Sequence, residues 1–262
     1  MIMVNNLTKF FHADDYGYSE SISNNILDCV DNGPINSVSI MINSEDYILN
    51  RIKNYKNLNL TLHLNLTSLT NPGNNKNKET LKNLTFSKIF FANKNLKKIC
   101  KEEIEFQIKK FLKDFNKTNL TIDGHHHIQI IPWVYKHLMS EYKSIIVNLR
   151  IPDEKIRFLS VRYLYSLTFY RNLIAVVVLK ILCVGRKKFM KKNFAGLLYS
   201  GIYNKNFLKK HLQCLENDSE NFEITFHPGF AGEAEINQFK NSHIKYVTSK
   251  NRFNEYSLLK NF

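Results

Sequence analysis

The sequence has few cysteines, and they form no cluster. The four, Cys29, Cys100, Cys183 and Cys214, are spaced neither as a CxxC pair nor as a zinc finger. Scattered thiols in a chain of 262 residues suggest a reducing compartment. We therefore expect a cytoplasmic protein, with a peripheral position at the inner face of the membrane as the alternative.

The sequence also lacks a signal peptide pattern and an uninterrupted membrane span. Residues 1–15 have no basic region followed by an apolar core. A spanning helix needs about 20 mostly apolar residues, but in the apolar segment 161–192 Arg171 and Lys180 break up the run. We expect this segment not to span; a helix lying on the membrane, with basic residues 186–192 near the headgroups, stays open.

Acidic residues are in the minority. There are 37 Lys and Arg against 23 Asp and Glu, a net charge of +14. This excess suits nucleic acid, an anionic membrane or an acidic substrate, or it reflects a chain rich in Asn, Lys and Ile. The basic residues are dispersed and no nucleic-acid-binding motif accompanies them, so we expect no nucleic acid partner.

Short apolar runs alternate with helical patterns along the chain. Nearly continuous apolar or β-branched runs are typical of strands buried on both faces. The candidate strands are 7–13, 37–42, 60–66, 120–123, 145–151, 196–200 and 222–227. The candidate helices are 21–31, 45–55, 94–115, 133–142, 156–184 and 205–216. Seven strand–helix units predict a parallel sheet in a closed or nearly closed barrel. The polar loop 68–80 is the clearest break, and without a linker we expect one domain over 1–262.

Reactive side chains follow six of these strands. They are Asp14 and Asp15, Asn43, His63, Asp123 with His125, His126 and His127, Arg150, and His227. Barrel enzymes build their sites at the carboxyl ends of the strands, so we expect these groups to meet. A carboxylate and two imidazoles leave positions open on a divalent ion, a second carboxylate can take a proton from water, and a further histidine can protonate a leaving amine. This set favours metal-assisted hydrolysis.

The segment DGHHHIQIIPW, residues 123–133, contains three consecutive histidines. On an extended strand, His125 and His127 would share one face and His126 the other, so at most two could meet one ion. From the triplet alone, both a metal site and a polar loop stay open.

Each of the other residues has a structural alternative when taken singly. The aspartate pair Asp14–Asp15 could form a turn or cap a helix. His63 could be a core histidine, Arg150 a solvated strand end, and His227 a turn residue before Pro-Gly. The functional interpretation depends on their occurrence together.

Five segments, in order, carry a family resemblance: HADDYGYSESISNNILDCVDNGPINSVSIMIN, LHLNLT, DGHHHIQIIP, LRIP and FHPGF. Over roughly residues 9–232 the sequence resembles the YdjC-like carbohydrate deacetylases, of the chitooligosaccharide or hopanoid-associated type. The resemblance implies a distorted (β/α) barrel of about seven parallel strands with surrounding helices. It also implies metal-dependent removal of N-acetyl groups from sugars.

The resemblance assigns roles to residues. It implies one divalent ion, Mg or Zn, with three ligands: Asp15, His63 and His125. Asp14 would be the general base, Arg150 would hold the charge and orientation of Asp14, and His227 would be the acid. Asn43 and His127 are expected to contact substrate, with a structural role as the alternative for each.

The sequence departs from the family pattern at His12, where Asn is usual, and at Thr61, where Gly is usual and Thr would narrow the pocket. Relatives continue with another element after NRFNEYSLLKNF, so we expect the last element of the barrel to be incomplete. The expected substrate is an N-acetyl amino sugar of an oligosaccharide or, by analogy from the apolar–basic segment 156–192, of a lipid-linked glycan. The alternative is a non-catalytic, membrane-associated carbohydrate-binding protein of the same fold.

Overall fold

The computed structural model describes residues 9–67, 69, 71–73, 75–186, 192–219, 221–239 and 241–262. The first two residues of the predicted strand 7–13 lie outside the described residues. So do parts of the polar loop 68–80 and residues 187–191 of the basic segment.

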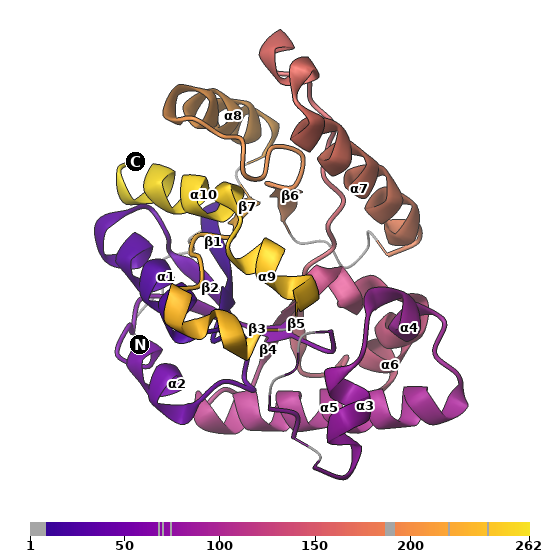
Figure 1. Ribbon diagram of the computed structural model, residues 1–262. Coiled ribbons are helices and arrows are strands. Elements are labelled where there is room, and N and C mark those ends of the chain that lie inside the picture. Colours follow the sequence, from indigo (N-terminus) through magenta and orange to yellow (C-terminus); the bar gives the residue numbers. More distant parts are fainter. Residues whose placement is uncertain are drawn as a thin grey trace, which may run out of the picture.

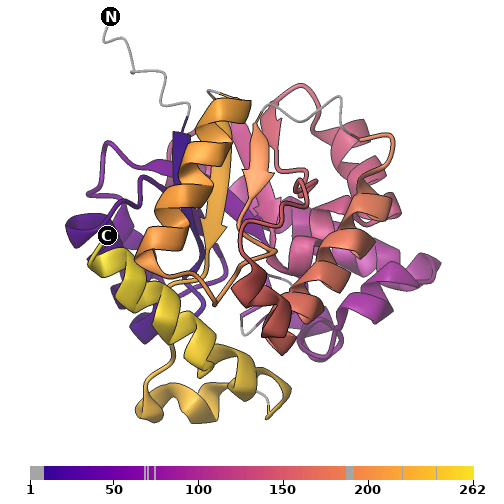
Figure 2. The same ribbon diagram turned by 90° about the horizontal axis from the view of Figure 1, so that it is seen from above.

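Seven parallel strands form one sheet that curls into a half-barrel surrounded by helices (Figures 1 and 2). In spatial order they are β5 (Ile146–Leu149), β4 (Leu120–Gly124), β3 (Asn59–Leu64), β2 (Ser37–Ile40), β1 (Lys9–Tyr16), β7 (Phe222–Phe226) and β6 (Asn193–Ala195). Every residue of β2 and of β7 is buried, including the two serines of β2 and Glu223 of β7, as expected for strands covered on both faces. The predicted distorted barrel of seven parallel strands is confirmed.

The barrel is open between β5 and β6. Among the described residues, no backbone pairing joins these two edge strands. Side chains lie across the opening instead: Arg150, just after β5, donates through Nε to Glu223 of β7 at 2.5 Å. Its guanidinium also lies 5.7 Å from the ring centroid of Phe194 on β6. The buried guanidinium of Arg150 therefore connects the β5 edge of the half-barrel with β6 and β7 across the opening.

The predicted strand 196–200 is wrong. The strand of this region is β6, and residues 196–200 form a turn. Gly196 has a φ of 117° and lies so close to β7 that a Cβ would be 2.3 Å from the carbonyl oxygen of Thr225. The carboxylate of Glu154 accepts the backbone N–H groups of Gly196, Leu197 and Leu198, at 3.3, 2.8 and 3.1 Å. These three N–H groups therefore bond to a carboxylate and not to a neighbouring strand.

The predicted helix 156–184 is also wrong in its first third. Residues 151–160 have no regular structure, and a 3-10 turn, η3 (Val161–Tyr165), precedes the helix α7 (Leu167–Cys183). The hydroxyl of Ser166 accepts the N–H of Phe169 and caps α7, so the helix begins there. No helix within the described residues has both the length and the apolar content needed to cross a bilayer.

The other predicted helices are present with shifted ends. They are α1 (Glu20–Asn32), α2 (Asp46–Ile52), α5 (Lys94–Asp114), α6 (Pro132–Glu141) and α8 (Lys205–Asp218). Ser19, Asn93 and Asn204 cap α1, α5 and α8 by accepting a backbone N–H of the first turn, which explains where these helices begin.

Several short elements and the C-terminal helices were not predicted. They are η1 (Asn75–Asn77), α3 (Lys78–Lys82), α4 (Phe86–Phe90), η2 (His125–Ile130), η5 (Glu233–Gln238), α9 (Asn241–Val247) and α10 (Lys250–Lys260). The segment in which we expected an incomplete barrel element forms α10, which packs against α1 (Figure 1). Gly33, after α1, lies so near α10 that a Cβ would be 2.5 Å from the carbonyl oxygen of Leu259. Phe262, after α10, lies beside β1, with its ring centroid 6.2 Å from that of Phe11.

Candidate active site

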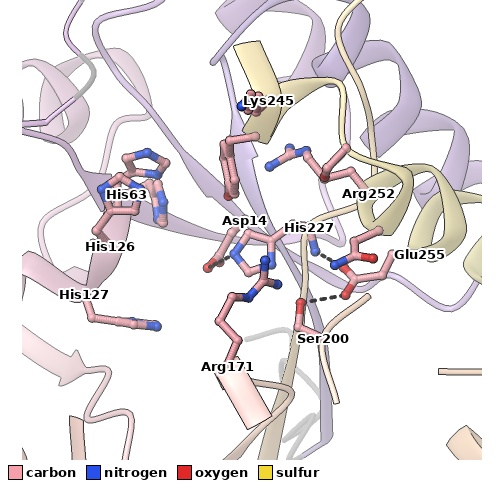
Figure 3. A pocket seen from close by; sticks show the side chains of 15 residues that line it. Asp14, His63, His126, His127, Arg171, Ser200, His227, Lys245, Arg252 and Glu255 are labelled. Carbon is pink, nitrogen blue, oxygen red and sulfur yellow. Dashed lines mark hydrogen bonds and ion pairs between the residues drawn. The ribbon is translucent and has the colours of Figure 1, made fainter. Parts of the chain in front are cut away.

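A cavity of about 460 Å³ lies at the carboxyl ends of the strands. Six of the reactive side chains noted in the sequence line it: Asp14, His63, His125, His126, His127 and His227. Figure 3 shows the histidines of the β3 and β4 ends on one side and residues of α10 on the other, with Asp14 and His227 between them. The strand ends thus bring together groups that are far apart in the sequence, such as Asp14 and His227.

A bulge in β1 places Asp14 and Asp15 at the same site. The register of β1 against β2 shifts between Ala13 and Tyr16, and Asp15 has a φ of 75°. Neighbours on a regular strand face opposite sides. The extra residue and the left-handed backbone let both carboxylates lie at the carboxyl end of β1, next to the cavity. Such strain in a residue other than glycine is typical of functional positions.

The three predicted metal ligands converge. Asp15, His63 and His125 each offer one ligand atom within 4.8 Å of the others, and all three side chains are buried. Asp15 Oδ1 lies 2.9 Å from His125 Nδ1 and 3.3 Å from His63 Nε2. The Nε2 atoms of both histidines are buried without a hydrogen-bond partner, a situation that costs about 1–3 kcal/mol per group. One carboxylate with two imidazoles is a donor set for a divalent ion, so these residues fit one.

Other buried groups hold these ligands in place. Asp123 Oδ1 accepts from His63 Nδ1 at 2.6 Å, which leaves His63 Nε2 facing Asp15. On the other side, Asp15 Oδ2 accepts from Arg252 Nη1 at 2.7 Å and from the Tyr246 hydroxyl at 3.0 Å. With Oδ2 engaged, Oδ1 of Asp15 is the oxygen that faces the two imidazoles.

Asp14 is held as a carboxylate by Arg150. The guanidinium donates to both oxygens of Asp14, from Nη1 at 2.8 Å and from Nη2 at 3.0 Å, and Ser39 Oγ adds a bond of 2.8 Å. Burial alone would raise the pKa of Asp14, but the Arg150 charge outweighs it and holds that pKa well below its usual range. His227 Nε2 lies 3.8 Å from Asp14 Oδ2. An ionised carboxylate therefore stands between the candidate metal ligands and the candidate acid.

A second group of acids and histidine, His12, Asp14 and Asp123, also has ligand atoms within 4.8 Å of one another. The Arg150 guanidinium contacts both carboxylates of this group, because its Nη2 also lies 3.1 Å from Asp123 Oδ2. Both ring nitrogens of His12 bond to serine hydroxyls of β2, at 2.7 and 2.8 Å. These bonds make the group a support that holds Asp14 in position. Thr61, expected to narrow the pocket, instead donates to Asp123 at 2.8 Å.

The histidine triplet is not an extended strand, so its side chains do not point alternately to two faces. β4 ends at Gly124, and His126 and His127 have left-handed φ values of 53° and 56°. Only His125 reaches Asp15. His126 and His127 both line the cavity. His126 is exposed, with Nδ1 3.1 Å from the Thr67 hydroxyl, whereas His127 is buried and has a pKa that burial and the Arg150 charge lower to about 3.

Asn43 is not brought to the cavity. Its side-chain amide donates to Glu103 Oε1 at 2.9 Å and to the carbonyl oxygen of Asn71 at 2.8 Å. These bonds tie the end of β2 to α5 and to the following loop. The scaffold alternative for Asn43 is therefore the one that the structure favours.

The C-terminal helices supply site residues that the sequence did not reveal. Besides Arg252, α10 places Glu255 against the cavity, where Oε2 accepts the backbone N–H of His227 at 2.5 Å. Oε1 accepts from Ser200 Oγ at 2.8 Å and from the N–H of Gly201 at 2.6 Å (Figure 3). Glu255 thus fixes the backbone that carries His227. The sequence offered one signal for these residues: Arg252 and Glu255 are three positions apart, a spacing that puts both side chains on the same face of a helix.

The chain is similar to known proteins over most of its length. A family model described as YdjC-like protein matches residues 10–261. A carbohydrate deacetylase of Oceanobacillus iheyensis is 25% identical over 227 residues, which are 85% of each chain. A carbohydrate deacetylase of Clostridium beijerinckii is 31% identical over 154 residues, 55% of this chain and 61% of that one.

A solved structure from Enterococcus faecalis, described as a cellobiose-phosphate cleavage protein, has a TM-score of 0.61 and 15% identity. The match covers 96% of this chain and 90% of the other. At that identity the likeness shows the fold alone.

Proposed function

The chain belongs to the YdjC-like family, and we propose that it is a carbohydrate deacetylase. The proposed reaction uses one divalent ion, Mg or Zn, and removes an N-acetyl group from an amino sugar. The observation that carries the proposal is the position of Asp14. It is an ionised carboxylate beside the buried Asp15–His63–His125 group and 3.8 Å from His227. The candidate base, the candidate acid and two candidate ligands, His63 and His125, thus line one cavity.

The metal would be held by Asp15, His63 and His125, whose two unpartnered Nε2 atoms suit it. When bound, such an ion lowers the pKa of water and polarises a carbonyl oxygen. His63 would have to release a proton to hold the ion, because the Asp123 and Asp14 carboxylates outweigh the lowering effect of burial and raise its pKa to about 10.

The chain's own groups move the protons. Asp14 takes a proton from the attacking water, whose oxygen bonds to the amide carbon. Arg150 keeps Asp14 ionised and fixes both of its oxygens. When the C–N bond breaks, His227 gives a proton to the nitrogen, so the amine leaves neutral and acetate remains. Glu255 holds the backbone of His227 during this step.

The substrate is an N-acetyl amino sugar of an oligosaccharide or of a lipid-linked glycan. His127 lies in the cavity wall, with its ring centroid 6.0 Å from that of Phe194, and is placed to contact the sugar. Arg171 and Lys245 line the cavity from α7 and α9, on opposite sides of Asp14 in Figure 3. These two side chains place positive charges in the wall of the cavity.

The proposal includes a cytoplasmic location, with a peripheral position at the inner face of the membrane as the alternative. All four cysteines are free thiols, which suits a reducing compartment.

Acetate release tests the function. The purified chain is incubated with a panel of N-acetylated oligosaccharides and glycolipids, with chelator and after addition of Mg or Zn. We expect acetate from at least one substrate, loss with chelator and recovery with metal. Sugar binding without acetate release in the presence of either metal would instead support the non-catalytic carbohydrate-binding alternative.

A further inference from the structure

The exposed apolar side chains of this protein are concentrated in one segment. Of the 16 large apolar side chains that are exposed among the described residues, 12 lie between Ile156 and Val184. Tyr165 and Leu167 are 87% and 89% exposed. We call the exposed side chains of residues 156–184 the apolar face. Concentration of this kind marks an interaction surface.

Helix α7 forms most of the apolar face and lies on the outside of the molecule (Figures 1 and 2). Its inner side packs through Phe169 and Val176. The opposite side would be polar in an ordinary surface helix. Here it presents Leu167, Ile174 and Ile181, which are seven residues apart and therefore share one side.

The surroundings of the apolar face are positively charged. The sequence has no Asp or Glu from Lys155 to Leu215. Some of the described cations of this stretch pair with acids outside it: Lys155 and Arg157 with Asp218, Lys180 with Asp153, and Lys192 with Glu223. Within the described part of the chain, Arg162 and Arg171 have no ion-pair partner. The occupant of this face must therefore tolerate or prefer positive charge.

An anionic lipid bilayer meets both requirements. Apolar side chains can enter the boundary between headgroups and acyl chains while Lys and Arg approach the lipid phosphates. A second copy of this chain would bring two basic segments together and is disfavoured by repulsion. With 17 residues, α7 is suited to lie along the surface.

The cavity opens beside this face. Arg171 belongs to α7 and also lines the cavity that contains Asp14 and His227 (Figure 3). We infer that the apolar face docks the protein on an anionic membrane and presents the cavity to an N-acetylated sugar carried by a lipid. The second half of this inference rests on the proposed function, whereas docking does not.

Flotation with vesicles tests docking without any activity. The chain should bind vesicles of phosphatidylcholine with phosphatidylglycerol, bind pure phosphatidylcholine much more weakly, and lose affinity as salt is raised. The triple variant Leu167→Ser, Ile174→Ser, Ile181→Ser should bind at least about a hundredfold more weakly, because three apolar side chains no longer leave water. The matched control is Phe91→Ser, since Phe91 is 80% exposed outside the face.

Charge is tested separately. Arg162→Gln should weaken binding to the anionic vesicles about fivefold, whereas Lys56→Gln, an exposed lysine far along the chain, should not. Equal binding by the triple variant and the parent would overturn docking. So would a dimer in lipid-free sedimentation that the triple variant dissociates, because the face would then be a contact between copies.

Two substrates separate docking from catalysis. With metal present, the triple variant should release acetate from a short soluble N-acetyl sugar at the parent rate, yet lose most of its rate on an N-acetylated glycolipid in anionic vesicles. Equal rates of parent and variant on the glycolipid would overturn the lipid-borne substrate. Absence of acetate from both substrates, with vesicle binding intact, would overturn the proposed function and leave docking standing.

Discussion

Arg252 Nη1 donates to Asp15 Oδ2 at 2.7 Å, joining residues 237 positions apart in the sequence. This bond and that from the Tyr246 hydroxyl engage one oxygen of Asp15 and direct the other to His63 and His125. The first candidate ligand is therefore oriented by the last helix. The site is complete only when α10 is packed against α1.

The first prediction concerns the metal ligands. His63→Ala should lose the ion, because it removes one of three ligands. Asp123→Asn should retain it with about 10–100-fold lower affinity, because the acceptor that orients His63 is weakened. Metal content by elemental analysis and affinity by calorimetry check both. His137→Ala, on α6 away from the site, is the control; undiminished metal in folded His63→Ala would contradict the assignment.

The second prediction separates Asp14 from Asp15. Asp14→Asn should keep the ion but lose about 10²–10⁴-fold in kcat, because Asn cannot take a proton from water. Asp15→Asn should lose metal affinity. The two variants are compared by metal content and by acetate release at saturating metal. If Asp14→Asn lost the ion and Asp15→Asn kept it, the two roles would be exchanged.

The strand ends could be predicted because burial on both faces leaves nearly continuous apolar runs, each followed by reactive groups such as His63 and His227. The carboxylate pair could be found, but not the bulge that turns both members to one site. The φ of 75° at Asp15 depends on the register with β2, which no local pattern reveals.

The contribution of α10 could not be predicted for a related reason. Arg252 and Glu255 belong to a helix with little apolar periodicity, and their partners lie at the other end of the chain and after β7. Likewise, Glu154 takes the backbone donors that would have extended β6, a competition between side chain and sheet that only the folded arrangement decides.

The third prediction is a pH dependence of stability that arises outside the site. Burial, and to a lesser extent Arg157, lower the pKa of His211 from 6.5 to about 4, and its Nδ1 lies 2.8 Å from the Tyr203 hydroxyl. As pH falls, the unfolded chain takes up this proton first. The contribution to the free energy of unfolding is thus complete above pH 6.5 and is lost between pH 6.5 and 4, by about 3 kcal/mol.

Urea unfolding of His211→Gln and the parent, with chelator at several pH values, measures this contribution. The variant should be less stable near pH 7, and the difference should shrink toward pH 4. Gln213→Ala, on the exposed side of the same helix, should show no such trend. A difference that stays constant with pH would show that His211 does not titrate differently in the two states.

The fourth prediction identifies the acid. An amine leaves an amide poorly without a proton, whereas the phenolate of an activated acetyl ester leaves unaided. His227→Ala should therefore lose about 10²–10⁴-fold in kcat on an N-acetyl sugar and retain most of its rate on the ester. Glu255→Gln, which keeps the imidazole but weakens the hold on its backbone, should fall between the parent and His227→Ala on the sugar. Equal loss on both substrates would assign His227 to the metal or to stabilisation of the developing oxyanion. An unchanged rate on the sugar would make it structural, and the acid would then be sought among His126 and His127, which also line the cavity, and His12.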